Sequence, residues 1–125
     1  MDISKMKSKL NMSNLYFSRC EFKREAVIES TELETTINRN VSKISDHTYS
    51  VELNLEMKSD DMHILVVANA DFSIDSEDYS NETVIINKNT VAIMFPFIRS
   101  QVSLMTSQPG MVPIVLPPIN VNEME

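Results

Sequence analysis

Glycine, cysteine and tryptophan are almost missing from this chain of 125 residues, which has one glycine, one cysteine and no tryptophan. A phosphate-binding P-loop needs two glycines and a dinucleotide-binding fingerprint about three, so both sites are excluded. Cys20 has no second cysteine for an internal disulfide, and a lone thiol is typical of a reducing cytoplasm. No stretch approaches the roughly 20 apolar residues of a membrane span, and the N-terminal residues lack the apolar run of a secretory signal.

The balance of charge excludes further classes of protein. The formal net charge is −7, which argues against binding to nucleic acid or to anionic lipid, because both ligands need a basic surface. Hydrophobic residues make up 42% of the chain, which is typical of a globular protein. We expect residues 1–12 to form a polar leader and residues 13–125 to form a single domain.

Four segments have the pattern of β-strands, and short turns are expected to join them, the first at Glu29-Ser30-Thr31. Residues 49–57 are the clearest, because apolar and polar residues alternate strictly there. Residues 15–27 do not alternate cleanly, which predicts a β-bulge near Cys20. The other two predicted strands are residues 32–44 and 62–74. With the long helix that follows, this order predicts an α+β fold, a four-stranded antiparallel meander with one long helix packed on it.

Residues 91–106 have helical spacing and carry two apolar stripes. The main stripe consists of Val91, Met94, Phe95, Ile98, Val102 and Met105. The second stripe consists of Ile93, Phe97 and Leu104, roughly 140° away around the helix. A helix that covers one sheet needs only one apolar face, so the second stripe must contact another part of the chain or another subunit.

The two ends of the helix also carry signals. Asn87, Asn89 and Thr90 can each cap a helix start, and residues 82–87 fit a short helical piece before it. Pro96 lies where the helix interior would be, which predicts a kink or a late start of the helix. The helix is expected to end near Ser107, before Pro109 and Gly110.

Residues 111–121 are apolar and rich in proline. With Pro113, Pro117 and Pro118 inside it, this segment cannot be a regular central strand. It is expected to be an extended connector across an apolar surface. Met111 is better suited to a binding groove than to a core, because a side chain in a proline-rich connector is hard to bury in a core. The methionine side chain also adapts to varied partners.

Few side chains have the pattern of a metal-binding or catalytic site. His47 and His63 lie on different elements without other ligands at metal-binding spacing, so we expect neither metal nor cofactor. Cys20 has no histidine partner nearby in the sequence, as a catalytic thiol would need. The acidic segment 75–81 lacks the glycine and glutamate frame of a calcium loop, which favours a solvated loop. We therefore expect no catalytic residue and no enzymatic activity.

Several segments resemble the SecB family of cytosolic export chaperones. Residues 94–99 (MFPFIR) resemble the family signature LFPYAR, and residues 116–120 (LPPIN) resemble the family sequence LAPVN. Residues 15–16, 46–55 and 72–74 resemble family segments in the predicted strands. These similarities keep their order and approximate spacing from Leu15 to Val121.

The resemblance implies a tetramer, a dimer of dimers, that binds unfolded polypeptides in apolar grooves. In the family, long helices lie between subunits, which would give Ile93, Phe97 and Leu104 an oligomer interface. The implied client-binding positions are Leu33, Thr35, Ile37, Met111, Val112, Ile114 and Leu116. The residues alone leave an alternative open, in which Leu33 and Ile37 belong to an ordinary sheet core.

This sequence departs from the SecB pattern in two ways. The family continues into a second C-terminal helix, and the sequence ends at Glu125 without a counterpart. SecB docks the translocation ATPase SecA through acidic residues on its sheet, where this sequence has Arg19, Lys23 and Leu65. Because these residues replace the acidic ones, the sequence does not decide whether SecA is a partner.

The function expected from the sequence is that of an ATP-independent cytoplasmic holdase in protein export. A SecB-like chaperone dedicated to one client, such as the antitoxin of a toxin–antitoxin pair, is an alternative that does not need the acidic dock. An enzyme-like domain would need a pocket with a convergent polar cluster, and the sequence shows none. An adaptor for one folded partner would instead ignore unfolded chains.

Overall fold

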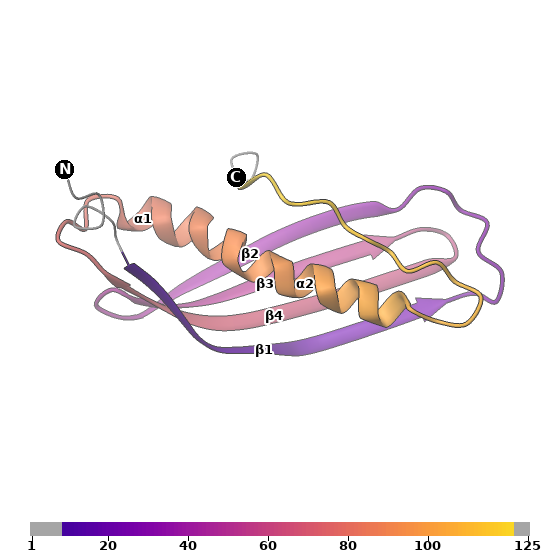
Figure 1. The fold of residues 1–125 in the computed structure, drawn as a ribbon, viewed down its shortest axis with the longest axis horizontal. Helices are drawn as coiled ribbons and strands as arrows, with labels where there is room; N and C mark the ends of the chain where they lie inside the picture. Colours follow the sequence, from indigo (N-terminus) through magenta and orange to yellow (C-terminus); the bar gives the residue numbers. More distant parts are fainter. Residues whose placement is uncertain (1–8, 122–125) are drawn as a thin grey trace.

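The computed structural model describes residues 9–121 and consists of an antiparallel sheet with a helical layer on one face (Figure 1). The elements in chain order are β1 (Lys9–Arg24), β2 (Glu34–Ser45), β3 (Thr48–Lys58), β4 (Met62–Asp75), α1 (Glu82–Val84), the π-helical segment η2 (Ile85–Asn89) and α2 (Thr90–Thr106). The predicted four strands and long helix are confirmed.

The order of the strands in the sheet differs from the predicted meander. It is β1-β4-β3-β2, so the meander holds only for β2, β3 and β4. Residues 25–33 carry the chain across the end of the sheet from β1 to β2, and the side chain of Asp61, in the β3–β4 turn, contacts them there. Its Oδ2 atom accepts hydrogen bonds from the backbone N–H groups of Glu29 (2.8 Å) and Ser30 (3.0 Å). These bonds lower the pKa of Asp61 from 3.8 to about 2.

Strand β1 is longer and less regular than predicted. It begins at Lys9, so residues 9–12 of the predicted leader belong to the strand, while residues 1–8 lie outside the described part. Its pairing with β4 shifts between Ser13 and Tyr16 and again between Phe17 and Arg19, beside the predicted bulge. Asn14 has a positive φ of 54°, and its side-chain amide donates a hydrogen bond to Asp71 Oδ2 (3.0 Å).

The core lies between α2 and the two central strands. One face of β3 is fully buried, as its alternation predicted, and β4 is buried on both faces around Val66, Val67 and Ala68. Helix α2 packs against β3 and β4 through Val91, Met94, Phe95, Ile98 and Val102. Of the predicted main stripe, Met105 alone is only partly buried.

The start of α2 corrects two expectations. The helix begins at Thr90 and continues through Pro96, so the late start is wrong, and the kink stays a prediction. No side chain caps the start, and the chain is already helical through α1 and η2, so α2 continues a helical segment and does not begin a new one. The hydroxyl of Thr90 donates to the carbonyl of Ile86 instead of capping. The predicted helical piece at 82–87 is confirmed.

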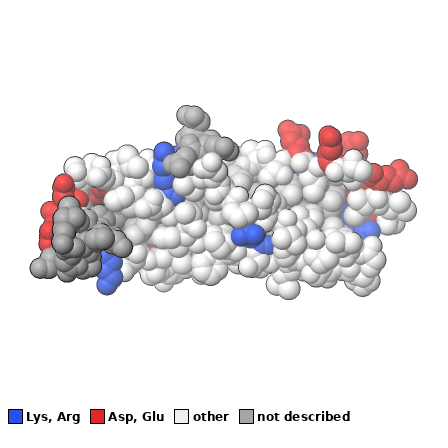
Figure 2. All heavy atoms as spheres, turned by 45° about the horizontal axis from the view of Figure 1, so that its top comes forward, with Lys and Arg blue, Asp and Glu red and all other residues white. Residues whose placement is uncertain are grey.

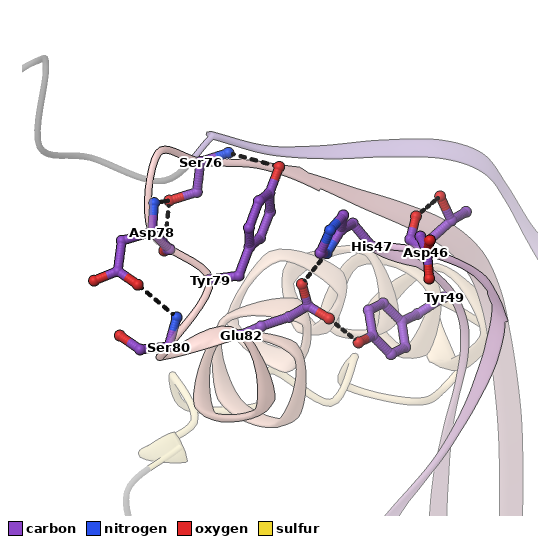
Figure 3. A network of polar contacts seen from close by, with 9 residues as sticks. Asp46, His47, Tyr49, Ser76, Asp78, Tyr79, Ser80 and Glu82 are labelled. Atoms are coloured by element: carbon purple, nitrogen blue, oxygen red, sulfur yellow. Dashed lines mark hydrogen bonds and ion pairs between the residues drawn. The ribbon is translucent and has the colours of Figure 1, made fainter.

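A polar network ties the start of the helical layer to the β2–β3 turn (Figure 3). The carboxylate of Glu82 accepts a hydrogen bond from the Tyr49 hydroxyl and contacts His47 Nδ1. The bond from Tyr49 lowers the pKa of Glu82, and the same bond raises the pKa of Tyr49 to about 12. The His47 ring stacks on Tyr79, with centroids 3.6 Å apart. This network fixes one end of the helical layer.

Candidate binding surface

The C-terminal tail, residues 107–121, runs back along α2 on the side where β2 lies (Figure 1). Ser103 Oγ donates a hydrogen bond to the carbonyl of Ile114 (2.8 Å), and Arg99 Nε donates to the carbonyl of Leu116 (2.9 Å). The N–H group of Ile114 donates to Thr106 Oγ1 (2.8 Å). The tail has no strand pairing, and Ile114 and Leu116 pack on the core. The predicted extended connector across an apolar surface is confirmed.

An apolar groove of about 470 Å³ opens where the tail begins. One wall is the connector between β1 and β2, and the other is the start of the tail after Gly110, with Met62 of β4 between them. The apolar residues that line it are Ala26, Val27, Ile28, Leu33, Met62, Met111, Val112 and Ile114. Val27 and Val112 are exposed, and Val112 is 85% exposed. The groove therefore offers accessible apolar surface and flexible methionine side chains.

Four of the seven predicted client-binding residues meet in this groove: Leu33, Met111, Val112 and Ile114. Thr35 and Ile37 pair with Met57 and Leu55 of β3, so they lie further along β2, on the face that the helical layer covers. Ile37 packs against the core, while Thr35 is exposed. Leu116 is only 7% exposed and belongs to the core, so a free client cannot reach it in this conformation.

Val27 was not predicted as a groove residue, because the sequence pattern placed it at the end of the first strand. The strand ends at Arg24 instead, and the apolar run Ala26-Val27-Ile28 falls in the connector. An apolar run inside a connector is the signal that would have indicated a surface site.

The outer face of α2 carries the second apolar stripe. Leu104 is 69% exposed, Phe97 is 43% exposed and Ile93 is partly buried. Arg99 is the one charged residue between positions 89 and 122. Figure 2 shows a long surface with few charges over this side of the molecule, with acidic side chains gathered toward its two ends. Such a face is typical of a surface that another protein covers.

Polar side chains do not converge on the groove. His63 Nε2 contacts Glu56 Oε2 (2.7 Å), and Cys20 is exposed on β1. Within residues 9–121, no cluster of three or more His, Cys, Asp or Glu side chains is arranged to hold a metal ion. None of the helices in this described range is long and apolar enough to cross a membrane. The surface is thus suited to binding apolar side chains.

Comparisons with known proteins agree with this architecture. The family model for preprotein translocase subunit SecB matches residues 7–124. An uncharacterized protein of Methanocaldococcus jannaschii is 26% identical over 126 aligned residues, which cover 92% of this chain and 81% of that protein.

Two solved structures have the same fold. One is the SecB-like chaperone Rv1957 of Mycobacterium tuberculosis in complex with a ChAD peptide from the HigA1 antitoxin. Its TM-score is 0.66 at 13% identity, covering 89% of this chain and 88% of that one. The other is a Streptococcus agalactiae protein of unknown function, with a TM-score of 0.55 at 9% identity and coverage of 89% and 98%. Since the family model spans nearly the whole sequence, and the sheet, helix and tail follow the expected order, this chain belongs to the SecB family.

Proposed function

We propose that this protein is a cytoplasmic holdase chaperone, which binds unfolded polypeptides without ATP or a cofactor. The observation that carries the proposal is the open apolar groove between the β1–β2 connector and the start of the tail. Its exposed residues Val27 and Val112 have no partner within the described chain that would bury them. An apolar client side chain would bury this surface, at about 25 cal/mol per Å² of apolar area.

Affinity for a long client would come from several grooves at once. A single groove of this size accepts only a few side chains, so each contact is weak. A polypeptide that wraps an oligomer engages the second groove at a high effective concentration. We propose that the oligomer is a homotetramer, a dimer of dimers, in which Ile93, Phe97 and Leu104 of α2 form an interface between subunits. The exposure of Phe97 and Leu104 supports this interface, as does the presence of a single charged residue, Arg99, between positions 89 and 122.

The charges on the outer face of the sheet, which the helical layer does not cover, bear on whether SecA is a partner. Arg19 lies on this face and forms an ion pair with Glu21, and Lys23 follows two residues later on β1. A partner that binds carboxylates at these positions would bind this face more weakly, because the two cations do not attract it. The related chaperone of M. tuberculosis has a peptide of an antitoxin bound, and we propose an antitoxin-like client as the alternative to a general export role.

Purified SecA distinguishes the two roles. We expect no binding of SecA to the wild-type chain, and measurable binding after Arg19→Glu with Lys23→Glu, because the double variant restores acidic residues. Titration calorimetry would measure both affinities. Tight binding of SecA to the wild-type chain would support the export role and exclude the dedicated-client alternative as the sole function.

Suppression of aggregation tests the groove itself. A chemically denatured enzyme that aggregates on dilution is the client, and light scattering follows aggregation. We expect Val112→Asp and Val27→Asp to lose most of the protection, because each places a carboxylate in the groove at an exposed position that the fold tolerates. Val84→Asp is the matched control, since Val84 is also exposed but lies on α1, away from the groove. A wild-type chain that gives no protection, yet binds one folded protein, would support an adaptor instead.

A further inference from the structure

Helix α2 holds the tail through main-chain atoms. Arg99, Ser103 and Thr106 bind two carbonyls and one N–H group of the tail, and none of these three hydrogen bonds involves a side chain of the tail. Such bonds carry no information about the identity of the residue that they hold. Any extended polypeptide with a free N–H group at the right position could make the same three bonds.

The spacing of the three side chains fits an extended chain. Arg99, Ser103 and Thr106 follow the i, i+4, i+7 rule, so they lie in a row along one face of α2. Ser103 and Arg99 are about 6 Å apart along the helix axis, and they bind the carbonyls of Ile114 and Leu116. Two residues of extended chain span about 6.7 Å. The helix therefore matches the repeat of an extended strand that runs antiparallel to it.

The tail also has the side-chain pattern of an extended apolar segment. Ile114 and Leu116 point toward the core, while Val115 between them is 76% exposed. The hydrogen bonds from Arg99, Ser103 and Thr106 thus hold the tail so that every second side chain contacts the apolar core. This is the arrangement in which a holdase would hold an extended client.

We propose that Arg99, Ser103 and Thr106 form a main-chain-binding ladder for extended polypeptides, that the tail occupies this ladder in the free protein, and that a bound client replaces the tail. The proposal rests on the proposed holdase function and extends its client site, because Ile114 both lines the open groove and is bound by the ladder, so release of the tail also opens that wall of the groove. The client class is a polypeptide segment with apolar residues at alternate positions.

The tail's composition makes it a replaceable occupant. Pro113, Pro117 and Pro118 have no N–H group, so the tail lacks a donor immediately before Ile114 and at the two positions after Leu116. A client without these prolines can make every hydrogen bond that the tail makes, and it retains additional N–H groups. The side chain of Leu116 fills the core position that a client residue would take over.

Two substitutions in the tail, one buried and one exposed, test whether a client replaces the tail. Leu116→Ser removes the buried apolar side chain that anchors the tail and leaves Arg99, Ser103 and Thr106 unchanged. The tail then competes less with a client, so the apparent affinity for the client should rise about tenfold. Val115→Ser changes the outward-facing neighbour and should leave the affinity unchanged. If the tail were a fixed wall of the client site, Leu116→Ser would instead weaken binding. Fluorescence anisotropy with labelled, reduced and carboxamidomethylated α-lactalbumin, which stays unfolded, measures the affinities.

Amide hydrogen exchange tests the same exchange in the unmodified chain. With the α-lactalbumin probe bound, we expect faster exchange at residues 111–116, because the Ile114 N–H group loses its bond to Thr106. Unchanged or slower exchange in a sample that contains the complex would overturn the replacement of the tail and leave the holdase function standing. A sample in which size-exclusion chromatography detects no complex would overturn both.

Discussion

Replacing the two exposed apolar residues of α2 should dissociate the oligomer without unfolding the chain. Phe97→Ser with Leu104→Ser removes apolar side chains that are 43% and 69% exposed in the single chain, so the subunit loses little of its own packing. Full burial of such a side chain is worth about 2 kcal/mol. In the proposed interface, two symmetry-related copies would meet isologously, so the change would appear twice.

The exposed parts of Phe97 and Leu104 together amount to about one whole side chain, so each subunit loses about 2 kcal/mol. The two copies together lose about 4 kcal/mol for one interface, which corresponds to about a thousandfold in its dissociation constant. Light scattering after size-exclusion chromatography, over a dilution series, should show the wild-type chain near four subunits and the double variant at a smaller mass. Ile44→Ser is the control, because Ile44 is exposed at the end of β2 and lies outside α2. The reasoning would be refuted if the double variant kept the wild-type mass at every concentration while circular dichroism showed both proteins folded.

Three further predictions concern stability, and denaturant unfolding measures each of them. The pKa of Asp61 is lowered to about 2, so its stabilising contribution is complete above about pH 4 and is lost as the pH falls toward 2. Asp61→Asn should flatten this part of the pH profile, and a variant that kept the wild-type slope would contradict the assignment. Ile98→Ala should lower the free energy of unfolding by 2–5 kcal/mol, because Ile98 is fully buried. Ile44→Ala, at an exposed position, should change it by less than about 0.5 kcal/mol, and equal losses would place Ile98 outside the core. Gly110→Ala should cost about 1 kcal/mol, since Gly110 has a φ of 75° although an added Cβ meets no atom within 4 Å. A more stable Ala variant would mean that this turn has another conformation.

The elements whose sequence pattern is local were predictable. Residues 49–57 alternate strictly because one face of β3 is buried, and the main stripe of α2 is the face that packs on β3 and β4. The two-striped helix also indicated an exposed apolar face, and the structure leaves Phe97 and Leu104 exposed.

Features that depend on contacts between distant segments were not predictable. The position of β1 beside β4 goes with the path of residues 25–33 across the end of the sheet. The side chain of Asp61 binds this segment from a turn 31 and 32 residues further along the chain than the two residues that it contacts. The burial of Leu116 depends on hydrogen bonds from α2 to the main chain of the tail, and main-chain bonds leave no mark on the sequence. The groove contains four of the predicted residues because the β1–β2 connector and the tail meet there, a contact between distant segments, and Val27 was assigned to the predicted first strand instead.

Binding of one polypeptide in two states tests the holdase account most directly. The wild-type chain is mixed with α-lactalbumin, either reduced and carboxamidomethylated or in its native folded form, and size-exclusion chromatography with light scattering gives the mass of each complex. The account predicts that the unfolded form co-elutes with an oligomer of this chain and that the folded form elutes alone. Co-elution of neither form, from a chain that circular dichroism shows to be folded, would contradict it.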